Sequence, residues 1–473
     1  MRIFFCLFSI LVSSVLFSQT QTPPWTLQQC IEWALKNNIQ VKQNMLNENS
    51  AAITLLQSKA QALPNLSGNA SNSYNSGKKV DPFTNQFTSG SFTQSQNFSL
   101  SSSVTLFSGL QNFNSIKQNQ YILMASREDV LKMQNDVSLQ IASAFLQILM
   151  AEELLAVARN QSDITKLQVE RTQKLVDVGN LPKGNLLDIQ AQYASEGVNI
   201  VSAENNLSLA SLNLVQMLNL DTIQFFSVAK PEITLPADVV LNTTPAQVYS
   251  VALTRQPEIK SAEFKLRSSE KSISIAKAGM YPRLSLSAAY GTGYSGAAQQ
   301  LKSYSISGYD TTGVTTGGQY VLGPKFNYDY QPIPYSTQYN NNINKSIGFY
   351  LSVPLFNNLQ THTSVERAKI SRENSVLALQ LQKDNLRKTI QQAYNDAMSS
   401  LKKYQATQKA VSAMEESFKY MEQKFTVGAA TSTEYNDSKN KLIKAKSDLL
   451  QSKYDAVFKM KVLDFYQGKP ITL

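Results

Sequence analysis

The chain has 473 residues, of which 42% are hydrophobic and 16% are charged, and its formal net charge is +10. The charged fraction is below the roughly 25% of an ordinary soluble domain, and Lys and Arg are dispersed among Asp and Glu, which argues against nucleic acid as a partner. With His362 as its only histidine and two cysteines, the sequence lacks the residues for a Cys/His metal cluster or a Ser-His-Asp triad. It therefore predicts no enzyme, no metal site and no cofactor.

The N-terminus has the pattern of a secretory signal peptide over residues 1–19. Arg2 precedes an apolar run from Ile3 to Phe17, which is too short to cross a bilayer. Its removal would leave Cys30 as the only cysteine, so no intramolecular disulfide is expected. No later segment approaches 18 consecutive apolar residues, which predicts no transmembrane helix and leaves β-strands as the only way into a membrane.

A first repeat is predicted over residues 20–220. It begins with a helix from Thr26 to about Leu63, which Pro64 ends. Apolar and hydroxyl side chains then alternate in two stretches separated by a polar loop, which predicts a strand pair with one apolar face. The remaining predicted boundaries are a β-hairpin at 65–107, a long helix at 109–178 and a returning helix at 185–219.

The long helix carries apolar residues at steps of seven, the spacing that keeps one helix face against a partner helix. These residues are Ile116, Leu123, Val130, Val137, Ala144, Ala151 and Ala158. The returning helix has its own ladder, made of Leu186, Tyr193, Ile200, Leu207 and Leu214. Both patterns predict helices packed lengthwise, as in a coiled coil or a bundle.

A connector at 221–243 leads to a second repeat at 244–473. The second repeat is predicted to contain a helix, a β-hairpin at 283–356, a long helix at 358–427 and a returning helix at 433–466. Its hairpin includes a Tyr-, Gly-, Thr- and Asn-rich stretch at about 297–344, which is expected to be a loop near a membrane interface.

The two repeats align with constant offsets. A shift of 218 brings Pro64 onto Pro282, and a shift of 249 brings Phe107 onto Phe356 and Gly179 onto Gly428. The difference (249 minus 218) gives the second repeat 31 extra residues between Pro282 and Phe356. A duplication of this length predicts one supersecondary unit built twice.

The lengths of the predicted elements indicate an elongated layer of parallel helices and not a globular domain. Each long helix would be about 100 Å long, and the helices before and after it about 50 Å each, so two short helices end to end match one long helix. The strands are long enough to cross a bilayer when tilted. Four strands would leave two open edges, which lipid does not tolerate, so several chains must contribute to one barrel.

Several segments resemble the TolC-like outer membrane efflux family (outer membrane factors). They are Trp25-Thr26-Leu27, Ala34 to Asn38, the strand-to-helix joints Leu106-Phe107-Ser108-Gly109 and Val353-Pro354-Leu355-Phe356, and the turns at Val178-Gly179 and Val427-Gly428. Each motif is short, but their order is the same in both repeats and the resemblance covers nearly the whole mature chain.

The resemblance implies a mainly α fold with membrane β structure. A homotrimer would form a β-barrel of 12 strands in outer-membrane lipid, continuous with a periplasmic α-helical barrel of 12 tracks. It would serve as a passive exit duct joined by a periplasmic adaptor to an inner-membrane transporter of RND or ABC type. A type I protein-secretion or metal-efflux outlet is an alternative. A secreted coiled-coil adhesin or structural protein is another, although it does not explain the alternating strands.

The resemblance also implies two groups of functional residues. The periplasmic aperture would be formed by Asn185, Asp188, Glu434 and Asp437, which follow the turn glycines at matching distances. The adaptor-docking turns would contain Gly179, Lys183, Gly428 and Ala430, where Ala430 occupies the place of the family's tethering arginine. Inward carboxylates in three copies would favour cations; the competing interpretation is that they are solvated residues near a helix N-terminus.

Overall fold

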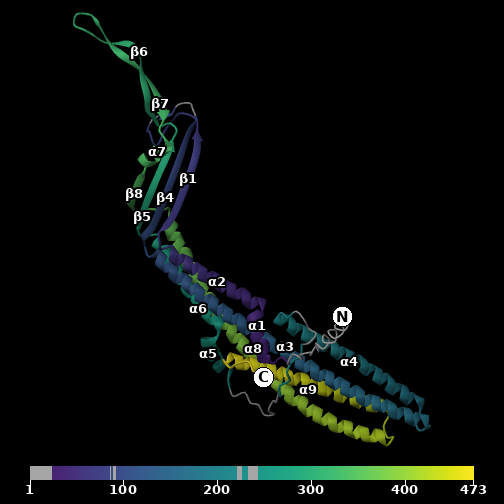
Figure 1. Cartoon of the computed structure of the whole chain (residues 1–473). Helices are drawn as coiled ribbons and strands as arrows, with labels where there is room; N and C mark the ends of the chain where they lie inside the picture. Colours follow the sequence, from purple (N-terminus) through teal and green to yellow (C-terminus); the bar gives the residue numbers. More distant parts are fainter. Residues whose placement is uncertain (1–23, 86, 89–91, 221–225, 233–242, 473) are drawn as a thin grey trace, which may run out of the picture. The chain divides into compact units, whose positions relative to one another are not determined.

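The computed structural model describes residues 24–85, 87–88, 92–220, 226–232 and 243–472. The expected signal peptide lies outside these residues, as does most of the expected connector. The chain divides into two compact units. The first unit contains the chain up to Ala51, Ile122–Leu266 and Asn374–Leu473. The second unit contains Ala52–Tyr121 and Arg267–Glu373. Four helices, α2, α3, α6 and α8, have residues in both units (Figure 1).

Each repeat opens with two helices instead of the single helix expected in the first. The four helices are α1 (Leu27–Asn37), α2 (Ile39–Ala60), α5 (Pro245–Arg255) and α6 (Pro257–Ala278). Asn38 is extended, with ψ of 130°, and its side-chain oxygen accepts hydrogen bonds from the backbone N–H groups of Gln40 and Val41. Asn38 therefore begins α2 as an N-cap. Gln256 makes the same break 218 residues later (256 minus 38), where Pro257 starts α6.

The long helices α3 (Gln111–Asp177) and α8 (Gln360–Thr426) have 67 residues each. The returning helices are α4 (Lys183–Leu218) and α9 (Ser432–Tyr466). At 1.5 Å per residue, α3 and α8 are each about 100 Å long. Each long helix is preceded by two consecutive residues with positive φ, Gly109 and Leu110 in the first repeat and Asn358 and Leu359 in the second.

Equivalent positions form the apolar cores of the two repeats. The smaller cluster consists of Val248, Ala252, Ile259, Leu386, Ile390, Ala397 and Leu463. Shifting these positions back by 218 or 249 gives seven members of the larger cluster, namely Cys30, Ala34, Val41, Val137, Ile141, Ile148 and Leu214. The larger cluster adds Phe145, Leu146 and Leu149 on α3 and Tyr454 and Val457 on α9. The duplicated sequence therefore packs as a duplicated core.

The connector takes part in this larger core. In the part that the structure describes, Val228 forms a parallel bridge with Trp25, and Trp25 exchanges backbone hydrogen bonds with Ser227 and Ala229 at 2.8 and 2.9 Å. The Trp25 ring also packs against Phe226, with 6.1 Å between ring centroids. Burial of Cys30 in the same core raises the pKa of its thiol to about 12, so this cysteine is a packing residue.

One part of α3 is long and apolar enough to cross a membrane, by length and composition only. An 18-residue window of α3 has a mean hydropathy of 1.7, and half of that window is buried against other helices. The buried residues of α3 from Ile141 to Leu149 belong to the larger core. The apolarity of this helix is therefore explained by packing within the protein.

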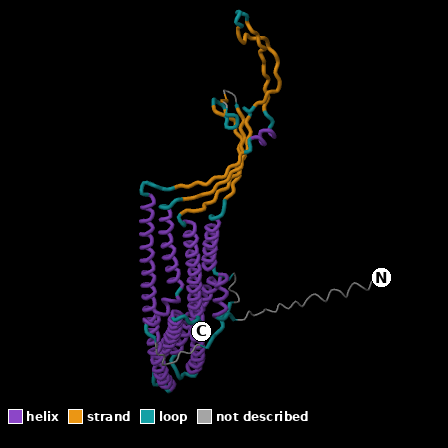
Figure 2. The backbone as a smooth tube through the Cα atoms, turned by 90° about the vertical axis from the view of Figure 1, so that its left-hand side faces the viewer, coloured by secondary structure: helices purple, strands orange, loops and turns teal. Residues whose placement is uncertain are grey.

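A four-stranded antiparallel sheet combines both repeats. Its order is β1 (Asn65–Asn75), β4 (Thr93–Ser108), β5 (Arg283–Ser295) and β8 (Asn344–Ser352), and Figure 2 shows the four strands side by side. The first repeat supplies β1 and β4, and the second supplies β5 and β8. Among the described residues, β1 and β8 each have one strand neighbour, so both are edge strands.

The register places the predicted apolar faces of all four strands on one side of the sheet. Leu100 lies opposite Tyr290, Val104 opposite Leu286, and Leu286 opposite Phe349. A bulge at Leu106 brings Phe107, instead of the expected Leu106, opposite Leu284. The other side of the sheet carries mainly small side chains, as in the row Ser67, Ser101, Ala289 and Ser346. Phe349 and Ile347 are 69% and 75% exposed, so the apolar side is uncovered in a single chain.

The stretch at 297–344 is not a loop. It forms the strands β6 (Gln299–Val314) and β7 (Tyr320–Pro332), which pair as a separate hairpin, followed by the short helix α7 (Tyr335–Asn341). The expectation of an irregular loop was wrong because three bulges in β6 interrupt the strand alternation. In the first repeat the same place holds only β2 (Lys79–Val80) and β3 (Phe87–Thr88), so the extra residues of the second repeat build the longer hairpin.

Candidate functional site

The two tips of the helical hairpins have the same backbone geometry. Gly179 and Gly428 have φ values of 77° and 76° and follow the last turns of α3 and α8. At the first tip, Gly179 N–H donates to Val176 and Asn180 N–H donates to Leu175; at the second, the residues 249 positions later repeat both bonds. This is the Schellman motif, whose C′ position favours glycine because it needs a left-handed backbone.

The four expected aperture residues lie within the first six residues of α4 and α9. Asp188, Glu434 and Asp437 are exposed and Asn185 is half-buried. Asp437 pairs with Lys441 at 2.7 Å. Lys183, Gly179 and Gly428 are exposed and Ala430 is half-buried beside them in the turns. Within one chain, the predicted residues therefore lie at the two tips, in the turns and at the helix starts that follow them.

Glu434 also has a structural task, because it follows Thr431 at the spacing of a capping box. Its carboxylate accepts hydrogen bonds from the backbone N–H and hydroxyl of Thr431 at 2.8 and 2.9 Å, while Glu434 N–H donates to Thr431 Oγ1 at 3.3 Å. This capping box begins α9. The backbone and side-chain hydrogen bonds from Thr431 lower the pKa of Glu434, so the carboxylate stays charged somewhat further into acid than an isolated glutamate.

A buried polar cluster joins α9 to α3 and α4, and sequence reasoning missed it. Lys439 and Glu196 are ion-paired at 3.2 Å, with side chains 2% and 4% exposed. Thr165 donates its hydroxyl hydrogen bond to Glu196 and accepts one from Lys439. The Gln192 side-chain amide donates to Glu196 Oε1 at 3.0 Å, the same oxygen that accepts from Lys439. Burial lowers the pKa of Lys439, while the charge of Glu196 opposes this shift.

The sequence did contain a signal for this cluster. Lys439 lies between Tyr435 and Leu442 on the apolar ladder of α9, and Glu196 lies between Tyr193 and Ile200 on the ladder of α4. A charged residue close to an apolar stripe is either solvated at its margin or buried with a partner. The pairing itself depends on which helices meet, which no single ladder specifies.

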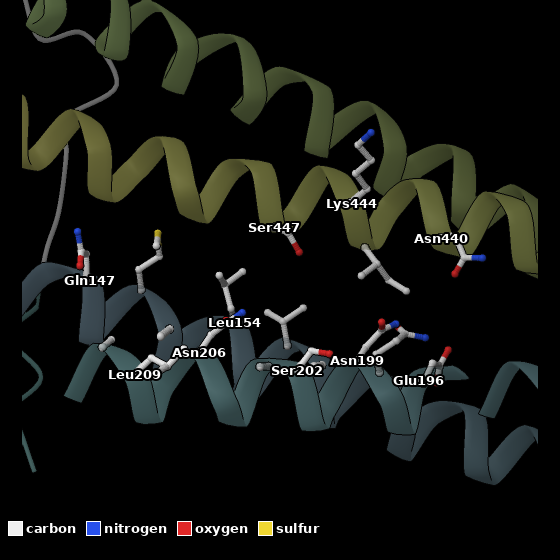
Figure 3. A pocket seen from close by; sticks show the side chains of 18 of the residues that line it. Gln147, Leu154, Glu196, Asn199, Ser202, Asn206, Leu209, Asn440, Lys444 and Ser447 are labelled. Carbon is white, nitrogen blue, oxygen red and sulfur yellow. The ribbon is translucent and has the colours of Figure 1, made fainter. Parts of the chain in front are cut away.

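A groove of about 820 Å³ lies beside this cluster, between α9 and the pair α3 and α4. In Figure 3, Ser447 and Asn440 of α9 face Leu154, Asn199 and Ser202 across the groove. Its walls are apolar side chains mixed with amides and hydroxyls. Polar contacts tie the helices together at both ends, at Lys439 and at Tyr454, whose hydroxyl donates to Glu153 at 2.6 Å. No group of three His, Cys, Asp or Glu side chains in the described part of the chain could hold a metal ion.

The described geometry therefore consists of two equivalent helical hairpins, a sheet with an uncovered apolar side, and polar tips. Residues 30–220 and 248–465 match the family described as "Outer membrane efflux protein". The chain belongs to this family. It is accordingly an outer-membrane protein of the TolC-like class, a class of channels that serve tripartite efflux systems.

Individual relatives of this outer membrane efflux protein are distant in sequence. It is 22% identical to "Outer membrane protein TolC" of Escherichia coli over 68% of this chain and 59% of that protein. It is 18% identical to "Outer membrane efflux protein BepC" of Brucella suis over 95% and 86% of the two chains. Its fold is similar to the crystal structure of CusC, with a TM-score of 0.75, 17% identity, and coverage of 96% and 94%.

Replacing Lys439 tests the buried cluster. We expect Lys439→Met to lower the free energy of unfolding by about 3–5 kcal/mol, because Glu196 would remain buried with an unpaired charge. Adding Glu196→Gln should recover most of this loss, since the amide is neutral and of similar shape. Thermal unfolding followed by circular dichroism measures both. Lys444→Met, at an exposed position on α9, is the matched control. A double variant no more stable than Lys439→Met would contradict the assignment.

Proposed function

We propose that three copies of this outer membrane efflux protein assemble into a channel whose barrel has 12 strands, four from each copy. The observation that carries the proposal is the sheet β1-β4-β5-β8, which has one exposed apolar side, one side of small side chains, and two edge strands. In lipid, each unpaired backbone group costs several kcal/mol, so an open sheet must close. Pairing β1 of one copy with β8 of the next satisfies both edges at once.

The apolar side of the sheet tests this assembly. We expect Ile347→Lys to reduce the amount of trimer in the outer membrane sharply, because a lysine facing the hydrocarbon costs about 2–4 kcal/mol near the bilayer midplane. Ser346→Lys, one residue away on the opposite side, should be tolerated. Heat-modifiable migration on denaturing gels measures the trimer. Recovery of the unaltered protein as a water-soluble monomer would refute the proposal.

The helical part then forms the periplasmic duct, through which substrates move passively. Its partners are a periplasmic adaptor and an inner-membrane transporter of RND or ABC type. The support is family membership together with exposed, geometrically identical tips at Gly179 and Gly428. Small-molecule efflux, type I protein secretion and metal efflux would all use this duct, because the transporter selects the cargo.

Cross-linking from a tip tests the adaptor contact. A photoreactive maleimide on Lys183→Cys should yield a product with the periplasmic adaptor in intact cells, because Lys183 is exposed at the first tip. The same label on Lys59→Cys, in the last turn of α2, is the control. Adaptor products from Lys59→Cys alone would place the docking surface elsewhere.

Glu434 and Asp437, together with Asn185 and Asp188, are proposed to line the periplasmic aperture. The carboxylates are exposed at the start of α9, and three copies would bring six of them to one ring of helix starts. Such a ring attracts cations and raises the barrier for anions. The capping role of Glu434 is compatible with this, since a carboxylate that accepts hydrogen bonds retains its charge.

Neutral replacements separate the two roles of Glu434. The variant Glu434→Gln with Asp437→Asn should reduce cation preference in single-channel recordings. It should leave the stability of α9 nearly unchanged, because glutamine also completes a capping box. Asp448→Asn, at an exposed position further along α9, is the control for net charge. Unchanged selectivity in the double variant would remove both residues from the aperture.

A further inference from the structure

The hairpin β6–β7 is the main addition that distinguishes the second repeat from the first. Its strands have 16 and 13 residues, whereas β2 and β3 at the equivalent place have two each. Figure 2 shows the hairpin continuing beyond the end of the four-stranded sheet. Among the residues that the structure describes, the first repeat has no counterpart of this long hairpin or of the short helix α7 that follows it.

The base of this hairpin is firmly attached to the sheet. The Gln338 side chain accepts from the backbone N–H of Ser295 at 2.9 Å and donates to the carbonyl of Ser295 at 3.0 Å. Ser295 also donates its hydroxyl hydrogen bond to the buried carboxylate of Asp81. The rings of Tyr294 and Tyr335 stack with centroids 4.0 Å apart. The hairpin therefore leaves the sheet at a fixed point.

One face of the hairpin is mainly apolar from Leu301 to Val314 on β6 and from Tyr320 to Tyr330 on β7. Every second residue of β7 from Tyr320 to Tyr330 is large and apolar or is proline, and its partners on β6 lie on the same face. That face contains Leu301, Tyr304, Ile306, Tyr309, Thr311, Val314, Tyr320, Leu322, Pro324, Phe326, Tyr328 and Tyr330. The other face carries Ser, Asn, Gln, Asp, Lys and Gly with a single valine, Val321.

Three irregularities in β6 preserve this separation. The register skips Lys302, Ser307 and Thr312, each of which is polar. Without these bulges, the apolar residues of β6 would be divided between the two faces, since side chains alternate with a period of two. The bulges therefore keep the apolar residues of both strands on one surface.

This surface is uncovered in a single chain. Tyr304, Leu322 and Tyr328 are 63%, 60% and 51% exposed. A two-stranded ribbon is marginally stable by itself in water, and a continuous apolar patch of this kind marks a contact surface. The face has about ten large side chains, and a full aromatic side chain has an area of about 150–250 Å². If each is about half exposed, the exposed area of the face is roughly 1,000 Å². That is comparable to the roughly 800 Å² per partner of a standard stable interface.

We propose that the apolar face of β6–β7 packs against the same face of neighbouring copies, so that the three hairpins share one apolar core beyond the barrel. This rests on the trimer proposed above. The edge strands β1 and β8 bring the copies together on one sheet, and the anchored bases then hold the three hairpins at the same rim. The contact between hairpins therefore continues the interface between sheets. Because the sheets already hold the copies together, each hairpin meets its neighbours at a high effective concentration.

Charge also favours a second copy as the occupant. Lys302 pairs with Asp329 at 3.3 Å and Lys325 with Asp310 at 3.2 Å, both within the same hairpin. The apolar face has no formal charge, so identical faces meet without like-charge repulsion. The tyrosine hydroxyls can remain at the margin in contact with water, as aromatic residues at interfaces do.

Single cysteines on the hairpin test this proposal in the full-length protein. The background is Cys30→Val, because valine occupies the equivalent buried position at Val248 in the second repeat. Phe326→Cys and Tyr328→Cys place a thiol on the apolar face, and Asn327→Cys places one on the polar face between them. A short bis-maleimide should link two chains about tenfold more efficiently at 326 and 328 than at 327, because facing thiols have a high effective concentration.

Two readouts separate the possible failures. If heat-modifiable trimer forms but positions 326 and 328 cross-link no better than 327, the proposal of a shared core is wrong. The proposed channel would still stand. Quenching of a fluorophore on Tyr328→Cys by brominated lipid would then identify the membrane as the occupant. If no trimer forms in the background protein, both proposals fail. Cross-linking that alternates in an intact trimer supports the shared core.

Discussion

Unpaired backbone groups on two strand edges are the constraint on which the rest of this architecture depends. β1 and β8 each leave one row of N–H and C=O groups without a strand partner in the described chain. In water such edges invite aggregation, and in lipid each group costs several kcal/mol. The closure with other copies that we propose would remove this cost, and it would also fix how the elements attached to the sheet are arranged around one axis. The helices and the β6–β7 hairpin of each copy would inherit this arrangement.

Duplication lets one chain build its sheet and its helical part from two equivalent repeats, each of which supplies two of the four strands. The two cores use the same positions, from Cys30 and Val248 to Leu214 and Leu463. Even the strand-to-helix joints repeat, since Leu110 and Leu359 have φ values of 64° and 60°. A left-handed backbone at a leucine is strained, so its presence in both repeats indicates that the direction of the joint matters more than its local cost.

Periodicity made much of the fold predictable from sequence. Ladders at steps of seven, glycines at the turns and strand alternation correspond to α3, α4, α8, α9 and the four-stranded sheet. The break at Asn38 was missed because a capping asparagine within a helical pattern resembles an ordinary surface residue. The β6–β7 hairpin was missed because three bulges interrupt the alternation of β6.

The candidate site was less predictable, for a physical reason. Positions such as Asp188 and Asp437 follow from their distance to a glycine, but the aperture role proposed for them requires several copies of the chain around a common axis. The cluster of Lys439, Glu196 and Thr165 depends on contacts between α3, α4 and α9 that are far apart in sequence. Local patterns identify helix faces, and only tertiary packing decides which polar groups are buried together.

Packing around Tyr435 shows how differently the two sides of α9 are held. Its ring lies 5.3 and 4.7 Å from the rings of Phe418 and Phe425 on α8, whereas its hydroxyl accepts a hydrogen bond from Gln168 on α3. An aromatic contact loses its apolar burial when helices separate, but water can replace most of a hydrogen bond, whose net contribution is about 0.5–1.5 kcal/mol. At Tyr435, α9 is therefore held to α8 by apolar burial and to α3 by a hydrogen bond. One turn further along, the buried Lys439 adds a second link from α9 to Thr165 on α3 and to Glu196 on α4.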